Sequence, residues 1–204
     1  LIVWHLRALA KAGFREVIIN HAWLGEQIES TLGDGSQWGL HLSYSPESSA
    51  LETAGGIAKA LDFFQGQPFL LMNGDIWSDW NPAQAFAMAE RLHTGPELAW
   101  LVLAPNPPHH PDGDFGMLEG QAHLCAKTCA NAQSATLSGI GVYKPELFAQ
   151  LPKGQPAKAA PLLHAAIARK QVLGTLHAGF WMDIGTPERL AQLNQYLESR
   201  APSQ

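Results

Sequence analysis

The sequence is poor in cysteine. Its two cysteines, Cys125 and Cys129, lie four positions apart in a polar, irregular segment of the 204-residue chain. A disulfide framework of the kind that stabilises small secreted domains is therefore excluded. We expect two free thiols in a reducing compartment, with the cytoplasm as the natural location.

Charge and long apolar runs are also scarce. Charged residues make up 15% of the chain, the formal net charge is -5, and no basic stripe gathers Lys and Arg. This composition argues against a nucleic-acid partner. No apolar run is long enough to cross a membrane and the sequence shows no signal-peptide pattern, so we expect no membrane partner.

Apolar residues and turn formers are plentiful. The chain is 46% hydrophobic and contains 19 Gly and 14 Pro, which is typical of a globular protein with many turns. A chain of this length can bury roughly 70% of its unfolded surface in one domain. We find no internal repeat and no linker, so residues 1–204 are expected to form a single domain.

Helical and strand-like segments alternate through the first half of the chain. Helices are predicted over residues 1–12, 25–32, 53–61, 82–93, 159–169 and 187–199, with a short one near residue 145; strands are predicted over 16–20, 40–44, 69–72, 99–103, 115–118, 123–126, 137–143, 172–177 and 179–182. Such alternation predicts an α/β fold in which helices flank a largely parallel sheet.

One strand ends at a carboxylate. The apolar run 69–72 stops at Asn73-Gly74-Asp75, and ligands of open α/β sheets bind beyond the carboxyl ends of such strands. Asp183 ends a second apolar segment in the same way. Two such carboxylates suit Mg²⁺, which takes one or two protein carboxylates together with substrate phosphates. The alternative is that they are ordinary turn or capping residues, with Asp183 bonding backbone near Gly185.

Small residues mark two further candidate positions. Residues 53–56, Thr-Ala-Gly-Gly, open a helix, where free N–H groups favour anionic or polar ligands; tight packing of the loop against the helix is the alternative. The strand 137–143 carries alternate glycines, which suggests close approach of a ligand or of other backbone. His109 and His110 lack a third metal ligand at suitable spacing, and we interpret them as surface histidines.

Several motifs, in this order, resemble those of the sugar-1-phosphate nucleotidylyltransferases. They are Leu51-Glu52-Thr53-Ala54-Gly55-Gly56-Ile57, Asn73-Gly74-Asp75, Phe115-Gly116, Ser138-Gly139-Ile140-Gly141-Val142-Tyr143, and residues 181–190 with the sequence WMDIGTPERL. Within that family the chain is most similar to the N-acetylmuramate-1-phosphate uridylyltransferases of bacterial cell-wall recycling. The segments 17–25, 44–47 and 106–115 carry this likeness, as does Glu52, where many relatives have Gly.

The resemblance implies a fold and a reaction. The fold is a Rossmann-like, mostly parallel mixed sheet flanked by helices, of the nucleotide-diphospho-sugar transferase type. The reaction joins UTP and a sugar 1-phosphate into a UDP-sugar and pyrophosphate, with no covalent nucleophile on the protein.

The resemblance also implies site residues. Asp75 and Asp183 are the catalytic residues that hold Mg²⁺. The nucleotide side comprises Glu52, Thr53, Ala54, Gly55 and Asn73, and the sugar side comprises Gly116, Ser138, Gly139 and Trp181. The protein is expected to be a monomer or a homodimer.

Two departures from the family pattern stand out. The Gly-rich loop and Lys-Pro that cradle the triphosphate are absent, so we expect the domain to be incomplete at its N-terminus, with a central strand unaccounted for. The Glu-Lys-Pro sugar motif is not visible before Ser138. Two alternatives therefore stay open: a transferase for another sugar, such as glucose or mannose 1-phosphate, and a non-catalytic module that binds nucleotide sugars.

Overall fold

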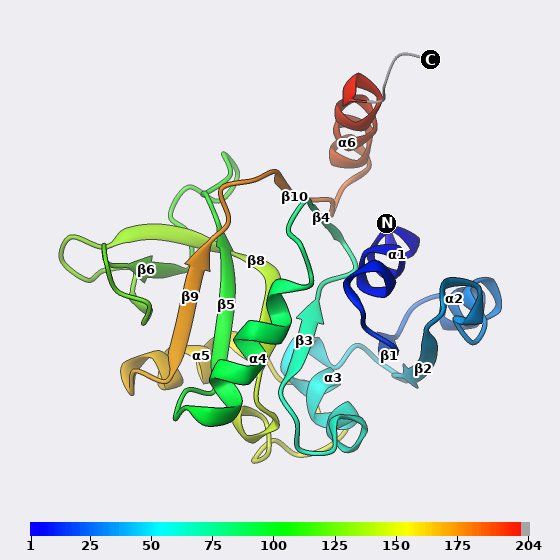
Figure 1. Ribbon diagram of the computed structural model, residues 1–204, viewed down its shortest axis with the longest axis horizontal. Coiled ribbons are helices and arrows are strands. Elements are labelled where there is room, and N and C mark those ends of the chain that lie inside the picture. The colour runs from blue at the N-terminus through cyan, green and yellow to red at the C-terminus, as the bar shows by residue number, and fades with distance from the viewer. Residues whose placement is uncertain (201–204) are drawn as a thin grey trace.

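Helices pack on both faces of a mixed β-sheet in the computed structural model, which describes residues 1–200 (Figure 1). The α-helices are α1 (Ile2–Ala12), α2 (Gly25–Leu32), α3 (Glu52–Ala60), α4 (Gln84–Thr94), α5 (Ala159–Ala168) and α6 (Pro187–Arg200), and short 3-10 helices cover Ser36–Trp38, Leu61–Phe64 and Pro145–Leu147. The strands are β1 (Glu16–His21), β2 (His41–Pro46), β3 (Phe69–Met72), β4 (Ile76–Ser78), β5 (Ala99–Ala104), β6 (Phe115–Met117), β7 (Cys125–Ala126), β8 (Gln133–Tyr143), β9 (Val172–Leu176) and β10 (Trp181–Asp183).

Each predicted helix and strand has a counterpart in the structure. Gly13 ends α1 with φ 104°, a left-handed value that glycine adopts without strain. Thr186 caps α6, because its Oγ1 accepts a hydrogen bond from the backbone N–H of Arg189 at 3.3 Å. The sequence did not predict β4, which follows the Asn73-Gly74-Asp75 turn at once.

The α/β fold class is confirmed, but most strand pairs are antiparallel. The strand β8 pairs antiparallel with β3, β5 and β6, whereas β5–β9 and β1–β2 are the parallel pairs. The expectation of a largely parallel sheet is therefore wrong in this respect. No crossover helix lies between β5 and β8 in the described chain, so β8 returns in the opposite direction. The strands β3, β5 and β9 still share one direction, and their carboxyl ends lie at the upper edge in Figure 1.

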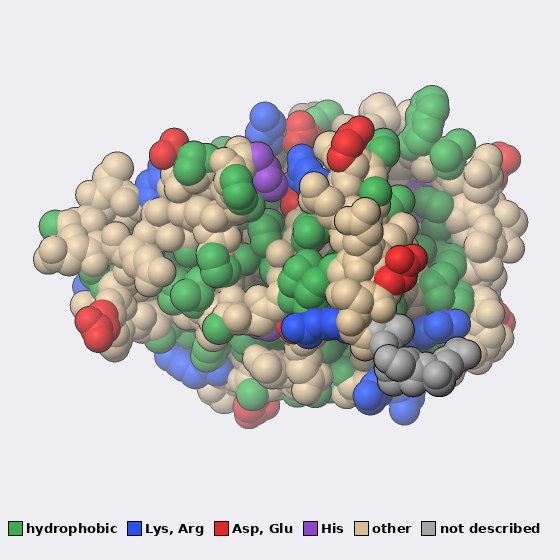
Figure 2. Space-filling model, turned by 90° about the horizontal axis from the view of Figure 1, so that it is seen from above, with side chains coloured by type: hydrophobic (Ala, Val, Ile, Leu, Met, Phe, Trp, Pro, Cys, Tyr) green, Lys and Arg blue, Asp and Glu red, His purple; other side chains and the backbone are tan. Residues whose placement is uncertain are grey.

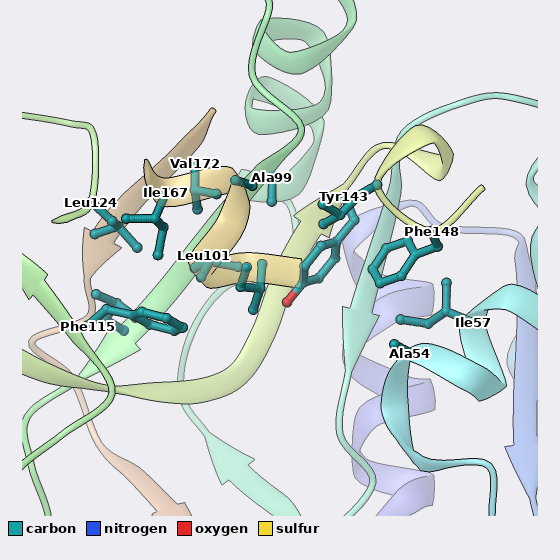
Figure 3. Close-up of a cluster of buried hydrophobic side chains, with 14 of the residues drawn as sticks. Ala54, Ile57, Ala99, Leu101, Phe115, Leu124, Tyr143, Phe148, Ile167 and Val172 are labelled. Atoms are coloured by element: carbon teal, nitrogen blue, oxygen red, sulfur yellow. The ribbon is translucent and has the colours of Figure 1, made fainter. Parts of the chain in front are cut away.

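The sheet separates two apolar layers. On β5 the side chains of Ala99, Leu101 and Leu103 contribute to the core covered by α3 and α5, while Val102 faces the layer under α4. Figure 3 shows residues of the first layer, including Phe115, Tyr143 and Phe148. Alternate residues of one strand thus serve both cores, as expected for a strand buried on both faces.

The strands β1 and β2 form a separate pair with α1 and α2. Their core centres on Leu6, Leu32 and Leu40. Within residues 1–200, β1 pairs only with β2 and β3 pairs only with β8, so each has one edge without a strand partner. Both strands line one cavity, which we call the β1–β3 groove.

The last helix packs on a small two-stranded sheet. The strand β10 pairs antiparallel with β4, and Trp77, Ile184 and Leu193 form a buried cluster where α6 packs on this pair. The cluster holds β10, and with it Asp183, against β4 and α6. No helix between residues 1 and 200 combines the length and the apolar character needed to span a bilayer.

Candidate functional site

The Asn73-Gly74-Asp75 turn is bonded to two other segments through its backbone. The N–H of Asn73 donates to the carbonyl of Gly139 on β8 at 2.8 Å, and the carbonyl of Asp75 accepts the N–H of Ile184 at 2.7 Å. Because Ile184 follows β10 directly, these bonds place the turn at the end of β3 beside the end of β10. The side chain of Asp75 is exposed and forms no hydrogen bond to another described residue.

Asp183 lies next to this turn. In the β4–β10 pair it is opposite Ile76, the residue that follows Asp75. Its Oδ1 accepts the N–H of Gly185 at 2.8 Å, and its Oδ2 lies 2.7 Å from Arg189 Nη1. Asp183 therefore accepts a bond from the Gly185 backbone, as the turn interpretation expects. It also lines a cavity together with Asp75.

Both aspartates line one cavity of about 310 Å³, which we call the aspartate cavity. It is lined by Asn73, Asp75, Ile76, Pro107, His109, His110, Thr136, Leu137, Ser138, Gly139, Trp181 and Asp183. These residues come from the β3–β4 turn, the loop between β5 and β6, the middle of β8, and β10. Six of the predicted site residues thus meet here: Asn73, Asp75, Ser138, Gly139, Trp181 and Asp183.

A bulge in β8 forms the floor of the aspartate cavity. The pairing of β5 with β8 shifts register between Val102 and Leu103, next to Ser138 and Gly139. The hydroxyl of Ser138 donates to the carbonyl of Val102 at 2.7 Å, and the backbone carbonyl of Ser138 accepts the indole N–H of Trp181 at 2.7 Å. The Ser138 side chain is therefore hydrogen-bonded to β5, and the bulge fixes the Trp181 ring at the cavity wall.

The donor set fits a divalent cation held jointly with substrate. Two carboxylates from adjacent segments line the aspartate cavity, and Mg²⁺ typically takes one or two carboxylates plus phosphate oxygens. No group of three or more His, Cys, Asp and Glu side chains suited to a metal exists within residues 1–200. The protein alone thus supplies only part of a metal coordination shell, which suits a cation that also takes phosphate oxygens of the substrate.

The β1–β3 groove is a larger cavity of about 720 Å³ on the other side of the turn. Asn73 lines both cavities, so the two meet at the turn. Most of the groove is apolar, but Asn20, Glu47 and Thr53 form a polar end, where Asn20 Nδ2 donates to Glu47 Oε1 at 3.2 Å. Thr53 and Asn73, two predicted nucleotide-binding residues, are brought together in this groove.

His5 adds an unsatisfied polar atom to the groove. Its side chain lines the cavity and is buried, and its Nε2 has no hydrogen-bond partner within the described chain. Burial lowers the pKa of His5 below its ordinary value, so the ring is neutral near pH 7. Sequence reasoning missed this residue, because it lies on the apolar face of a helix.

The structure does not bring the other predicted nucleotide-binding residues into either cavity. The N–H groups of Ala54 and Gly55 both donate to the carbonyl of Ala157, and a Cβ on Gly55 would meet the Gln155 carbonyl. Tight packing therefore accounts for these small residues. Glu52 is exposed and has φ 59°, a value that favours glycine.

Gly116 also lies away from the aspartate cavity. It is buried in β6, and a Cβ on it would meet the Ala126 carbonyl, Ala132 and Cys125 at 2.6–2.9 Å. Its missing side chain makes room for the β6–β7 hairpin. The proposed sugar contact of Gly116 therefore lacks support from its position.

His109 and His110, interpreted from the sequence as surface histidines, line the aspartate cavity. His109 Nε2 lies 3.7 Å from Asp183 Oδ2, and His110 Nε2 lies 3.1 Å from Asp114 Oδ1. Spacing along the sequence could not place these histidines at the cavity, because no third metal ligand lies near them in the chain. Their loop, 106–115, was already part of the family likeness, and this was the available signal.

The charges on this end of the molecule are dispersed. Figure 2 looks onto the upper end in Figure 1, and Lys and Arg side chains there are scattered without forming a continuous basic patch.

Comparison with known sequences identifies related enzymes. Residues 1–200 match the sequence profile of the family described as "Nucleotidyl transferase". An N-acetylmuramate alpha-1-phosphate uridylyltransferase of Neisseria meningitidis serogroup B is 48% identical over 195 residues, covering 94% of this chain and 82% of the relative. A mannose-1-phosphate guanylyltransferase of Mycobacterium tuberculosis is 26% identical, with 90% of this chain and 52% of the relative covered. The chain thus spans about half the length of that guanylyltransferase.

Solved structures share the fold. A Bacillus anthracis protein assigned as a glucose-1-phosphate thymidylyltransferase, solved with sucrose, superposes with a TM-score of 0.77 at 18% identity, covering 100% of this chain and 84% of that one. A UDP-glucose pyrophosphorylase without ligand gives a TM-score of 0.70 at 14% identity, covering 97% and 86%. Both comparisons support the nucleotide-diphospho-sugar transferase fold.

The bulge predicts a measurable effect on stability. Gly139 has φ 79°, and a Cβ there would lie 2.9 Å from the Asn73 side chain. We expect Gly139→Ala to lower the free energy of unfolding by about 2–4 kcal/mol, through left-handed strain and overpacking. Gly120→Ala is the matched control, because Gly120 has φ 71° but open space around it, and it should lose only about 1 kcal/mol. If urea denaturation gave equal losses of unfolding free energy for the two variants, the contact with Asn73 would not contribute to the effect.

Proposed function

The chain belongs to the nucleotidyl transferase family, and on this premise we propose that it transfers a uridylyl group from UTP to N-acetylmuramate 1-phosphate. The products are the UDP-sugar and pyrophosphate, in the context of bacterial cell-wall recycling. The nucleotide follows from the likeness to the Neisseria enzyme over 94% of the chain.

One observation carries this proposal. The Asn73-Gly74-Asp75 turn separates the β1–β3 groove from the aspartate cavity, and Asn73 lines both. A nucleotide in the polar end of the groove would direct its phosphates toward the turn, while a sugar phosphate in the aspartate cavity would approach from the other side. A Cβ added at Gly74 would meet no other atom within 4 Å, so the turn itself leaves space at this point.

Such a site needs no nucleophile of its own. An oxygen of the sugar phosphate attacks the α-phosphorus of UTP and forms the new P–O bond, while the bond from that phosphorus to the β-phosphate oxygen breaks and pyrophosphate leaves. The protein contributes by holding the two substrates in line and by stabilising charge. Enzymes of this family typically use a divalent metal, and we assign Mg²⁺ to Asp75 and Asp183. When bound, the metal would supply positive charge that offsets the repulsion between the two anionic substrates.

The remaining roles follow from position. We assign Thr53 and Asn73 to the nucleotide and the Trp181 ring, with the backbone of Ser138 and Gly139, to the sugar. Arg189 positions the Asp183 carboxylate through the 2.7 Å contact. Cys125 and Cys129 are both free, which supports our proposal of a cytoplasmic location.

The reaction itself is the first test. Protein expressed from the complete gene should release pyrophosphate from UTP and N-acetylmuramate 1-phosphate only when Mg²⁺ is present, as measured by a coupled pyrophosphate assay. A panel with glucose and mannose 1-phosphates, each with UTP and GTP, addresses the alternative suggested by the guanylyltransferase relatives. Faster turnover of mannose 1-phosphate would replace the proposed substrate, and binding of UDP-sugar without any turnover would favour a non-catalytic module.

The aspartates provide the second test. We expect Asp75→Asn and Asp183→Asn each to lower kcat by at least about a hundredfold, since each removes an anionic oxygen ligand. Thermal unfolding should change little for Asp75→Asn, because the carboxylate has no hydrogen-bond partner among the described residues. Asp62→Asn is the control: this exposed residue pairs with Lys153 on the surface and should keep normal kinetics. A variant of Asp75 or Asp183 with normal kcat would return that residue to a simple turn role.

A further inference from the structure

His109 is one of the side chains of the aspartate cavity whose hydrogen-bonding capacity is unused. Among the cavity-lining residues, only His109 and His110 have side chains able to carry a positive charge. His110 already contacts Asp114 Oδ1 at 3.1 Å. His109 is about half exposed and forms no hydrogen bond to another described residue.

The loop between β5 and β6 is fixed at its start by Asn106. Its Nδ2 donates to Ser134 Oγ at 2.8 Å and to the Pro111 carbonyl at 2.9 Å, and its Oδ1 accepts from Thr136 Oγ1 at 2.9 Å. Ser134 and Thr136 both belong to β8, so this strand determines where the loop begins.

The end of the loop is fixed to β8 as well. Asp114 Oδ2 accepts the N–H of Leu137 at 2.8 Å, and the Asp114 N–H donates to the Ala135 carbonyl at 2.9 Å. Since both ends are bonded to the strand that forms the cavity floor, His109 is held over the cavity before any ligand binds.

The ring of His109 points toward Asp183. Its Nε2 is 3.7 Å from Asp183 Oδ2, which is beyond hydrogen-bond distance. The two Asp183 oxygens already accept from Gly185 and Arg189, at 2.8 and 2.7 Å. A ligand oxygen in the cavity is therefore the partner that would satisfy the imidazole N–H, and the neutral ring with a proton on Nε2 can donate it.

From this geometry we propose that His109 donates a hydrogen bond to an anionic oxygen of the sugar substrate. The inference rests on the proposed function. Two groups share this chemistry: the 1-phosphate present in every substrate of the class, and the lactyl carboxylate that distinguishes N-acetylmuramate from N-acetylglucosamine. His109 binds substrate in either case, and the neighbouring aspartates make a donor here valuable, because they repel the incoming anion.

Binding of the two nucleotide sugars tests the proposal. Calorimetry with UDP-N-acetylmuramate and UDP-N-acetylglucosamine, which differ only in the lactyl group, should be run without metal on the wild type, His109→Ala and His109→Gln. We expect His109→Ala to weaken UDP-N-acetylmuramate binding by about ten- to a hundredfold, the range of a charge-assisted hydrogen bond, and His109→Gln to restore part of it. Loss confined to UDP-N-acetylmuramate identifies the carboxylate as the partner, and equal loss for both ligands identifies the phosphate.

Two results would overturn the proposal. One is wild-type affinity of His109→Ala for both ligands. The other is an equal loss in Pro108→Ala, which alters the same loop at an exposed residue outside the cavity lining and so reports on disturbance of the loop. Turnover of the wild type is measured in parallel: if it is absent, the proposed function fails, while the binding comparison still reports on His109.

Discussion

The site depends on the pairing of β4 with β10. This short antiparallel pair, extended by the bond from Ile184 N–H to the Asp75 carbonyl, brings two distant parts of the sequence to one edge of the sheet. Asp75 and Asp183 line one cavity from these two parts of the chain. The cluster of Trp77, Ile184 and Leu193 under α6 holds β10 in place. Apolar burial here thus maintains the position of Asp183 at the cavity.

The sequence predicted the local structure well, because most elements have strong periodicity and clear ends. Gly13 and Thr186 mark their helix ends as expected. The strand β4 was missed because its three residues gain their stability from β10, far along the chain. The sequence pattern could not predict that β8 runs antiparallel to its neighbours, because the alternation of apolar and polar residues is the same in parallel and antiparallel strands.

Site residues could be predicted from the sequence where their residue type has few structural roles, and less well where it has several. Carboxylates at strand ends led to Asp75 and Asp183, which the structure brings into one cavity. Glycines were ambiguous: Gly139 lines the cavity, whereas Gly55 and Gly116 allow close packing of other backbone. His109 is exposed, as expected from the sequence, but its place at the aspartate cavity was not predicted, because its neighbours there come from β8 and β10 and no spacing within the sequence reveals them.

We propose that Asp75 and Asp183 hold one divalent cation together with substrate phosphates. Electron paramagnetic resonance of Mn²⁺, titrated into protein saturated with UDP-sugar, measures this binding directly and does not depend on turnover. We expect one bound Mn²⁺ whose affinity falls by at least about tenfold in Asp75→Asn and in Asp183→Asn alike. Wild-type Mn²⁺ affinity in either variant would contradict it.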